Sequence, residues 1–325
     1  MALKFAVLGT AHPHVNSFIN GALARNDVEF SAISDMESAK REELKEKYQC
    51  PVFNDWRELL DKVKPDAAGC AEINGNRGEI AIECARRGIH ILADKPLVTK
   101  LEELDAIEKI ANSKPAWLCM TAFTLRFSEE GLTIMDVIKK GLLGKPASFY
   151  GCRTYKLGKG RPSWMFNEEK YGGIITDIGS HDIDLIRWFF HTEILDNKGV
   201  GRNVRTHEHP DFSDSVQAFM KCKNGMTAFL DVNWLAPDKQ PGHERTTIIT
   251  GSRGILRHEN TKFTLVNDEN ETQNITPVKT EDSAVKQFFD YCTGKSRNVL
   301  ITTSESLKST RASLEIQRNI KRQED

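Results

Sequence analysis

The sequence predicts two folds in succession: an α/β domain with a doubly wound parallel sheet, then an α+β domain with a mainly antiparallel open sheet. Over residues 3–121, short apolar strands alternate with amphipathic helices, which is typical of a parallel sheet with helices on both faces. From about residue 197, strands follow one another across turn signals such as Lys223-Asn224-Gly225. The 325 residues are enough for two ordinary domains, which we place at 1–122 and 123–325.

The elements of the first domain follow from the period of the apolar residues. We expect strands at 4–8, 28–34, 66–71 and 89–92, and helices at 15–25, 38–48, 56–63 and 78–87. In parallel sheets of this kind the ligand lies at the carboxyl ends of the strands. Functional residues are therefore expected just after each strand.

At the start of the second domain, the alternation of short apolar strands and amphipathic helices ends. We expect a helix at 130–140, a strand at 147–155, a loop at 156–171 and a helix after the Gly172-Gly173 pair. Strands are expected at 215–221, 226–234, 245–250, 254–257 and 263–266, and closing helices at 282–292 and 304–322. The pattern indicates an antiparallel sheet with helices on one face.

Composition excludes several classes of function. The apolar fraction is 39%, the charged fraction 28% and the net charge −1, so nothing favours nucleic acid or an anionic membrane as a partner. No apolar run approaches the roughly 20 residues of a membrane span, and the first strand is broken too soon to be a signal peptide. Seven scattered cysteines without a Cys-x-x-Cys fit a reducing cytoplasm, where we expect the protein.

The sequence also predicts no metal site. The only close histidine pairs are His12-x-His14 and His207-x-His209. Neither pair has a nearby cysteine or a helical partner four residues away, as metal-binding motifs usually have. Both pairs are expected in loops.

The turn after the first strand is a candidate dinucleotide site. Gly9, Thr10, Ala11 and His12 stand where a pyrophosphate would meet a helix N-terminus, although the full Gly-x-Gly-x-x-Gly pattern is absent. Asp35 ends the second strand, where a carboxylate accepts hydrogen bonds from ribose hydroxyls and repels a 2′-phosphate. No arginine follows it directly, so NAD is favoured over NADP. The alternative is that Asp35 caps the next helix.

Two further segments carry residues suited to proton transfer. Lys95 follows a strand directly and precedes a proline, which restricts it to an extended conformation at the strand end. In a regular helix, Asp177, His181 and Asp184 would share one face, and a carboxylate beside an imidazole can move a proton near neutral pH. The alternative is an exposed i, i+4 pair that only supports the helix.

Taken together, the motifs resemble the Gfo/Idh/MocA family of nicotinamide-dependent oxidoreductases. Its Glu-Lys-Pro, Arg-Phe, Gly-Gly, Asp-x-Gly-x-His-x-x-Asp and Gly-[Ser/Thr]-x-Gly motifs correspond here to Asp94-Lys95-Pro96, Arg126-Phe127, Gly172-Gly173, Asp177-x-Gly179-x-His181-x-x-Asp184 and Gly251-Ser252-Arg253-Gly254. This sequence departs from the family at the glycine loop, at Asn74-x-x-Arg77 where Asn-x-x-His is usual, and at Asp94 in place of glutamate.

The resemblance implies a dehydrogenase that takes a hydride from a secondary alcohol of a sugar, cyclitol or related polyol. It implies a Rossmann domain, a homodimer or homotetramer built on the open sheet, and joint action of Lys95, Asp177 and His181. Either His181 or Lys95 takes the hydroxyl proton. Asn74 joins the cofactor residues, and Trp164 in the basic loop closes over the substrate or is simply solvated. The alternatives are a redox-neutral hydrolase or epimerase that regenerates NAD, and a non-catalytic NAD-binding sensor.

Overall fold

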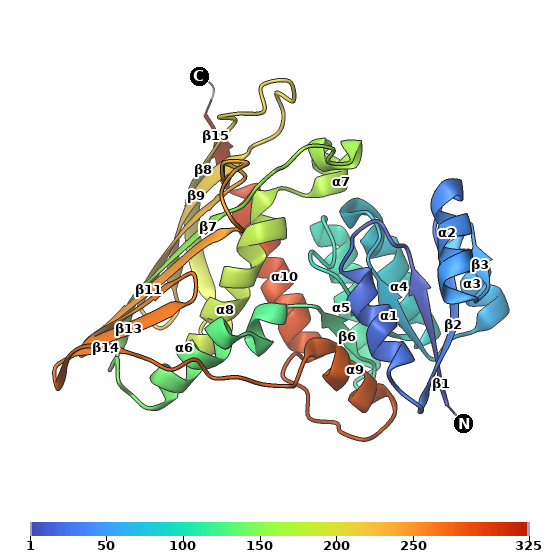
Figure 1. The fold of residues 1–325 in the computed structure, drawn as a ribbon, viewed down its shortest axis with the longest axis horizontal. Coiled ribbons are helices and arrows are strands. Elements are labelled where there is room, and N and C mark those ends of the chain that lie inside the picture. Colours follow the sequence, from blue (N-terminus) through green and yellow to red (C-terminus); the bar gives the residue numbers. More distant parts are fainter. Residues whose placement is uncertain (1, 324–325) are drawn as a thin grey trace. The chain divides into compact units, whose positions relative to one another are not determined.

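The computed structural model describes residues 2–323 of the chain (Figure 1). The chain folds into two compact units and enters each of them more than once. The first unit consists of residues up to Phe123, Glu169–Gly172 and Asp282–Thr310, and the second of Thr124–Glu168, Gly173–Glu281 and the residues from Arg311 onward. These units differ from a single cut at residue 122, because the segment from Asp282 returns to the first unit.

The first unit is a six-stranded, wholly parallel sheet with helices between its strands. The strands run in the order β3-β2-β1-β4-β5-β6. They are β1 (Leu3–Leu8), β2 (Val28–Ser34), β3 (Val52–Phe53), β4 (Ala67–Cys70), β5 (His90–Ala93) and β6 (Cys119–Thr121). The intervening helices are α1 (Val15–Leu23), α2 (Ser38–Tyr48), α3 (Trp56–Val63), α4 (Arg77–Arg87) and α5 (Leu101–Ser113). The order reverses between β1 and β4, which is the place where such sheets bind ligands.

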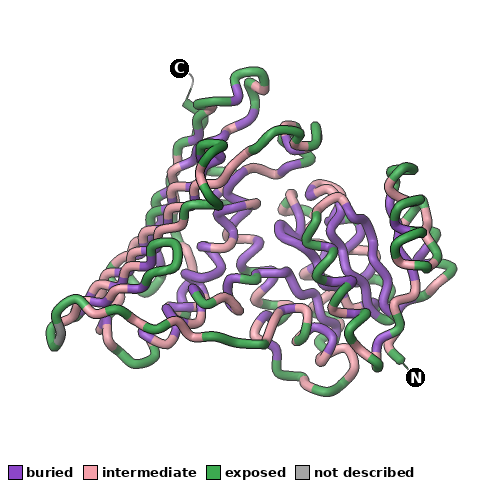
Figure 2. Tube along the Cα trace, viewed as in Figure 1, coloured by how far each residue is buried: buried purple, intermediate pink, exposed green. Residues whose placement is uncertain are grey.

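The central strands of this sheet are buried on both faces. Every residue of β4 is buried, as are the last four residues of β1. Figure 2 draws buried residues in purple. A parallel sheet covered on both sides requires such continuous apolar runs rather than alternation. The predicted doubly wound parallel sheet is therefore confirmed.

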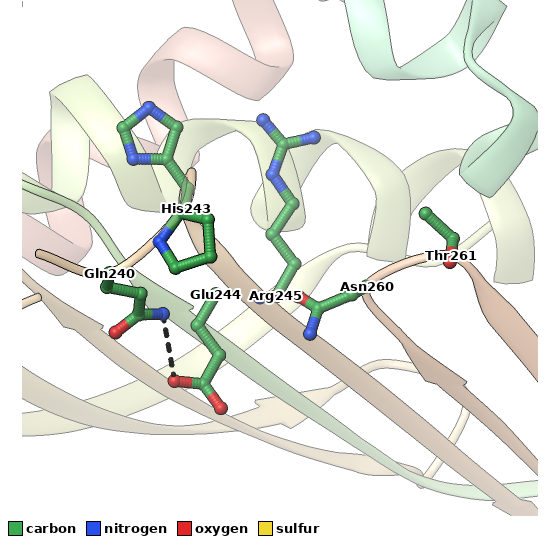
Figure 3. Close-up of a pocket in the computed structure, with 7 residues that line it drawn as sticks. Gln240, His243, Glu244, Arg245, Asn260 and Thr261 are labelled. Carbon is green, nitrogen blue, oxygen red and sulfur yellow. Dashed lines mark hydrogen bonds between the residues drawn. The ribbon is translucent and has the colours of Figure 1, made fainter.

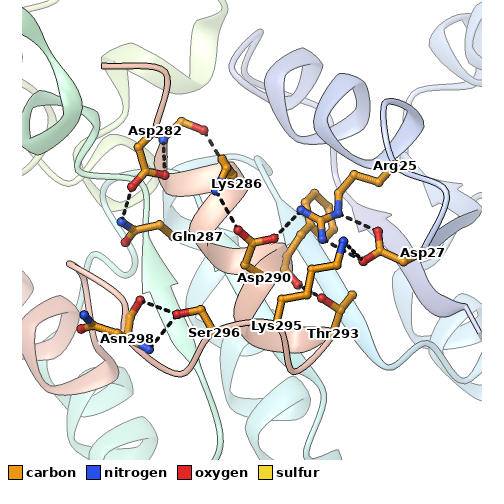
Figure 4. Close-up of polar contacts among 12 residues, drawn as sticks. Arg25, Asp27, Asp282, Lys286, Gln287, Asp290, Thr293, Lys295, Ser296 and Asn298 are labelled. Carbon is orange, nitrogen blue, oxygen red and sulfur yellow. Dashed lines mark hydrogen bonds and ion pairs between the residues drawn. The ribbon is translucent and has the colours of Figure 1, made fainter. Parts of the chain in front are cut away.

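The segment from Asp282 packs on this sheet through a helix that the sequence assigns to the second domain. In α9 (Ala284–Cys292), the Phe289 ring meets Phe5 of β1 edge to face at 4.9 Å. Asp290 accepts a hydrogen bond from Arg25 at 2.7 Å, and Arg25 also pairs with Asp27 (Figure 4). An apolar contact and a shared ion-pair network thus tie the end of α1 to α9.

The second unit contains a nine-stranded sheet. Its order is β14-β13-β12-β11-β7-β10-β9-β8-β15, and all pairs are antiparallel except β7–β10 and β8–β15. The strands are β7 (Pro146–Thr154), β8 (Ile194–Arg202), β9 (Ser215–Cys222), β10 (Thr227–Asn233), β11 (Glu244–Gly251), β12 (Gly254–Glu259), β13 (Lys262–Asn267), β14 (Asn270–Asn274) and β15 (Ile320–Arg322). The mainly antiparallel sheet of the prediction is confirmed.

Helices accompany this sheet on one face. They include α6 (Glu129–Lys139), α8 (Ser180–Phe190) and the last part of α10 (Thr303–Arg318), whose first part belongs to the first unit; α7 is Glu168–Tyr171. Strands β9 and β10 alternate buried and exposed residues, as a sheet with one covered face does. Phe219 and Phe229 are opposite each other on the other face and are 40% and 37% exposed.

Two general features of the chain complete the description. Within residues 2–323, no helix combines the length and apolarity needed to cross a membrane. The seven cysteines are free thiols.

Candidate functional site

The turn after β1 lies next to Asp35, the residue predicted to bind the ribose hydroxyls of a dinucleotide. Gly9 has a φ of 81°, a left-handed conformation that favours glycine. The hydroxyl of Thr10 donates to Asp35 Oδ2, and the Glu37 amide donates to Asp35 Oδ1 at 2.9 Å. Asp35 therefore stands beside the loop as predicted and also receives the N-cap amide of α2.

Helix α2 places two positively charged side chains, Lys40 and Arg41, near Asp35. Lys40 Nζ lies 3.7 Å from Asp35 Oδ2 and donates to the carbonyl of Thr10. Arg41 donates to the carbonyls of Asp35 and Met36 at 3.0 and 2.7 Å. The residues next to Asp35 in the sequence carry no positive charge, but the first turn of α2 adds positive charge near this carboxylate, which weakens the expected repulsion of a 2′-phosphate.

The Glu72 side chain restricts the space in this loop at the place expected for a pyrophosphate. A Cβ atom at Gly9 would lie 2.2 Å from Glu72 Oε2 and 2.9 Å from Glu72 Cα, so only glycine fits beneath this side chain. Burial, with Asp35 as a further cause, raises the pKa of Glu72. The His12 amide, which could face a phosphate, donates instead to the carbonyl of Ala71 at 2.9 Å. The residues present fit the adenosine end of a dinucleotide better than its pyrophosphate.

His12 and His14 occupy this loop and both contact Asp94, at the end of β5. His12 Nδ1 lies 3.2 Å from Asp94 Oδ2, and His14 Nδ1 lies 2.9 Å from Asp94 Oδ1. Burial lowers the pKa of His12 to about 4, against the opposing effect of Asp94. Burial alone would raise the pKa of Asp94, but Arg77 and the His14 hydrogen bond outweigh it and hold that pKa well below its usual range.

Arg77 fixes the turn that carries Lys95. Its guanidinium donates to the carbonyls of Lys95 and Pro96 at 2.6 and 3.0 Å and to the carbonyl of Glu72 at 2.7 Å. The Lys95 amide donates to Asp94 Oδ1 at 2.9 Å, and the Lys95-Pro96 peptide bond is cis. Lys95 is only 8% exposed. The predicted strand-end lysine is thus held in a well-defined buried turn.

Asn74 supports the same edge of the sheet. It is buried, and its amide nitrogen donates to the carbonyl of Tyr171 at 2.9 Å. The adjacent Gly75 lies so close to the main chain of Glu169 that a Cβ would approach its carbonyl oxygen to 2.6 Å. Asn74 therefore positions the segment Glu169–Gly172 within the first unit.

In the second unit, Asp177 and His181 lie on a turn that differs from a regular helix. Residues Ile175–Gly179 form a π-helical turn, and α8 starts at Ser180. From Ile174 to Arg187, Asp177 and His181 are the two residues with partial exposure, and the others are buried. π turns occur frequently at functional sites. The two predicted side chains are thus the accessible polar groups of an otherwise buried segment.

The glycine pair explains how the chain enters this turn. Gly172 and Gly173 have φ of 83° and 92°, which other residues rarely adopt. A Cβ at Gly173 would lie 2.3 Å from the side chain of Gln317, whose Oε1 accepts the Ile175 amide at 2.9 Å. Backbone freedom and a long-range hydrogen bond therefore shape the turn.

Asp184 does not belong to this accessible pair. It is 1% exposed and receives two hydrogen bonds from Arg126, at 2.8 and 2.7 Å. Asp182 likewise pairs with the buried Arg153, which also binds Glu130. The stripe of three polar residues expected from helical spacing is thus reduced to Asp177 and His181, because the π turn changes the spacing and Arg126 holds Asp184 inside.

The segment expected to be a loop, 156–171, contains two short helical turns, Ser163–Phe166 and α7. Trp164 is half-buried on the first of these turns. Nearby, Arg161 donates to the carbonyl of Lys156 at 3.0 Å and stacks over the Trp234 ring at 4.9 Å. The Arg161 side chain is therefore occupied by local contacts.

A surface hollow of about 540 Å³ lies elsewhere in the second unit (Figure 3). It is lined by Gln240, Pro241, His243, Glu244, Arg245, Asn260 and Thr261. None of the sequence-predicted site residues lines it, and most of its residues are exposed. The chemistry-bearing motifs are therefore not located at this hollow.

The parallel sheet with its switch point, the glycine turn and the Asp35 carboxylate define a Rossmann domain of the oxidoreductase class. Residues 3–122 match the sequence model described as "Oxidoreductase family, NAD-binding Rossmann fold", and residues 132–257 match the "GFO/IDH/MocA C-terminal domain". The chain therefore belongs to the Gfo/Idh/MocA family and is an NAD(P)-dependent dehydrogenase acting on CH–OH groups.

Named relatives are similar over much of the chain. A myo-inositol 2-dehydrogenase of Thermotoga maritima is 24% identical and covers 80% of this chain and 74% of its own length. A scyllo-inositol 2-dehydrogenase (NAD(+)) of Bacillus subtilis is 27% identical over 62% of this chain and 59% of its own length. A solved structure from Thermotoga maritima, described as a candidate oxidoreductase, has a TM-score of 0.90 at 23% identity and covers 98% of this chain and 97% of its own.

Proposed function

We propose that this protein is an NAD-dependent dehydrogenase that oxidises a secondary alcohol of a sugar, cyclitol or related polyol. The observation that carries the proposal is the accessible pair Asp177 and His181 within a buried segment, in a chain whose relatives include inositol dehydrogenases. A bound nicotinamide would supply the hydride acceptor. The chain itself must hold the dinucleotide, orient the alcohol and remove the hydroxyl proton.

For the cofactor, we assign Gly9, Thr10, Ala11, His12 and Asp35, together with Asn74 and Lys95. Asp35 supports the choice of NAD, because its carboxylate suits a ribose diol and repels a 2′-phosphate. Lys40, at 3.7 Å from Asp35, is the feature that would weaken this preference.

For the substrate, we assign His181 as general base and Lys95 as a cation that stabilises developing negative charge. An imidazole titrates near neutral pH, so its neutral form can accept the hydroxyl proton. A lysine ammonium stabilises a developing alkoxide by a charge-assisted hydrogen bond. Asp177, four residues before His181, orients the alcohol or the imidazole. Trp164 covers the substrate.

The test uses purified protein, NAD or NADP, and a panel of inositols, aldoses and anhydrosugars, with reduced nicotinamide as the readout. We expect His181→Ala and Lys95→Ala each to lower kcat about 100-fold or more. His207→Ala and Lys109→Ala, at exposed positions, serve as matched controls and should retain activity. Wild-type rates in both site variants would contradict the catalytic assignment.

The two alternative functions give different results in the same assay. A redox-neutral enzyme would retain nicotinamide through purification and convert substrate without net reduction. A sensor would bind NAD in a calorimetric titration and turn over nothing in the panel. Failure to bind either NAD or NADP would contradict the dehydrogenase and both alternatives.

For the oligomer, we infer a homodimer or homotetramer formed through the uncovered sheet face. Phe219 and Phe229 are paired across β9 and β10, and the Phe229 ring stacks on Tyr150 at 5.8 Å. Adjacent exposed aromatic rings are typical of interaction surfaces. Sedimentation should give a dimer or tetramer that Phe219→Glu together with Phe229→Glu dissociates. A monomeric wild-type protein at micromolar concentration would contradict this inference.

A further inference from the structure

His12, His14 and Asp94 form a compact group in the first unit. The two histidines lie in the turn after β1, and Asp94 follows β5 directly. The ligating atoms of the three side chains lie within 4.8 Å of one another, and no other such group of three histidine, cysteine or acidic residues occurs within residues 2–323. The sequence supplied no third ligand for His12-x-His14. The fold supplies it from 80 residues away.

This donor set is a familiar one for metal ions. Two imidazoles and one carboxylate bind Zn²⁺ in hydrolytic enzymes and Fe²⁺ in oxygenases, whereas Mg²⁺ prefers oxygen ligands alone. Two ligands about 2.0–2.1 Å from a tetrahedral ion are roughly 3.3 Å apart. The separations are close to that value: 3.2 Å from Asp94 Oδ2 to His12 Nδ1 and 2.9 Å from Asp94 Oδ1 to His14 Nδ1. A small change in the imidazole positions would therefore admit an ion.

The carboxylate is already fixed in position. The Asp94 side chain is 1% exposed and is held by the Lys95 amide at 2.9 Å and by Arg77 at 3.3 Å. Hydrogen bonds of this kind orient metal ligands and tune their affinity. Because Arg77 shares the carboxylate and adds positive charge, we expect binding weaker than that of a structural zinc centre.

The histidine side of the group is open to solvent. The side chains of His12 and His14 are 28% and 53% exposed. An ion can therefore enter without unfolding the loop, and three protein ligands would leave a coordination position for water or another small ligand. A buried anchor with an exposed entrance is what an exchangeable metal site requires.

We propose that His12, His14 and Asp94 bind one divalent transition-metal ion, of which Zn²⁺ and Co²⁺ are the test cases. The ion would sit at the turn after β1, near which Rossmann folds hold a pyrophosphate, and would supply positive charge where this chain lacks two of the three fingerprint glycines. The site goes beyond the proposed dehydrogenase activity and does not depend on it.

The experiment measures the metal directly. Full-length protein is treated with a chelator, exchanged into metal-free buffer and titrated with CoCl₂ and ZnCl₂ by calorimetry, while the visible absorption of Co²⁺ reports nitrogen and oxygen ligation. We expect one ion per chain, no competition from a tenfold excess of Mg²⁺, and at least tenfold weaker binding in His12→Ala and His14→Ala. His207→Ala and His209→Ala change the other His-x-His pair and serve as matched controls.

The possible results separate cleanly. One Co²⁺ per chain that is lost in the His14→Ala variant and kept in the His207→Ala variant supports the site. Absence of stoichiometric binding, or equal binding in wild type and both loop variants, overturns it and leaves the group as a hydrogen-bonded cluster. Circular dichroism of each variant verifies folding, and His14→Gln replaces His14→Ala if the latter unfolds. Because the readout is bound metal, a negative result leaves the dehydrogenase assignment untouched.

Discussion

Arg77 donates a hydrogen bond of 2.6 Å to the main-chain carbonyl of Lys95. The same guanidinium reaches the carbonyl of Glu72 and the carboxylate of Asp94. One buried side chain therefore links the ends of β4 and β5 and fixes the turn that carries Lys95, which we assign to catalysis. Arginine suits this position because its planar fork serves several acceptors at once.

Replacement of Arg77 should cost both stability and turnover. Arg77→Ala leaves the buried Asp94 without its cation, and we expect a loss of about 3–5 kcal/mol in the free energy of unfolding. Arg77→Lys keeps the positive charge but loses the planar guanidinium, so it should be less destabilising than Arg77→Ala. It should still lower kcat, because Lys95 is displaced. Urea denaturation and steady-state kinetics measure the two effects. An Arg77→Lys enzyme with wild-type kcat would show that the turn does not position Lys95.

The pairing of Arg126 with Asp184 predicts strong coupling between two family motifs. Both side chains are 1% exposed and joined by two hydrogen bonds. We expect Arg126→Met and Asp184→Asn each to destabilise by about 3–5 kcal/mol, because each leaves a buried charge or donor unpaired. The double variant should be more stable than the sum of the single losses predicts, by about 0.5–3 kcal/mol. Additive losses in thermal unfolding would contradict a direct interaction.

Local pattern was sufficient to predict most of the first unit. The helices α2 and α3 and the strand β2 lie at the predicted residues, because parallel strands and amphipathic helices carry continuous apolar signals. The two-residue strand β3 was not predicted, since a pair of residues has no period. The sequence pattern places the residues of the edge strand β15 in a helix, because the pairing of β15 with β8 is a long-range contact that the pattern does not contain.

The sequence proposes the members of the candidate site but does not indicate their geometry. Spacing indicated Asp177 and His181, yet the π turn depends on Gln317, which lies 142 residues from Ile175. Asp94 could be recognised as a motif residue, but nothing in the sequence placed it against His12 and His14. Long-range contacts of this kind leave no periodic trace, so they appear only once the sheet order is known.

The cofactor preference can be tested at Asp35 and Lys40. Asp35→Asn keeps an acceptor for the Glu37 amide but removes the charge, and we expect roughly tenfold weaker NAD binding, since hydrogen bonds to charged groups contribute about 1.5–3 kcal/mol. NADP binding should improve relative to NAD, because the charge that repels the 2′-phosphate is gone. Lys40→Ala should weaken NADP alone, and Lys45→Ala is its exposed control. Calorimetric titration of each variant with NAD and with NADP measures the two affinities. An unchanged ratio in Asp35→Asn would contradict the ribose assignment.

The charge of Glu72 beside Gly9 should affect both the stability of the fold and the binding of NAD. Burial, together with Asp35, raises the pKa of Glu72. A carboxyl group whose pKa is higher in the folded protein stabilises the fold fully below the unfolded-state pKa and loses that contribution as pH rises through the folded-state pKa. Glu72→Gln cannot ionise, and its side-chain oxygen can still accept from Asn76, so the variant should unfold at a higher temperature than wild type at pH 7.

This stability difference should shrink as the pH falls below the ordinary pKa of glutamate, where both proteins carry a neutral side chain. Glu46→Gln, at an exposed position of α2, is the control and should show little change at either pH. Removal of the charge should also strengthen NAD binding about fivefold, since like charges about 4 Å apart in water repel by about 1 kcal/mol. Thermal unfolding from pH 4 to 8 and NAD titration at pH 7 test the two effects separately. A Glu72→Gln protein that is less stable at pH 7, or that binds NAD more weakly, would indicate that the ionised carboxylate serves the loop rather than opposing the dinucleotide.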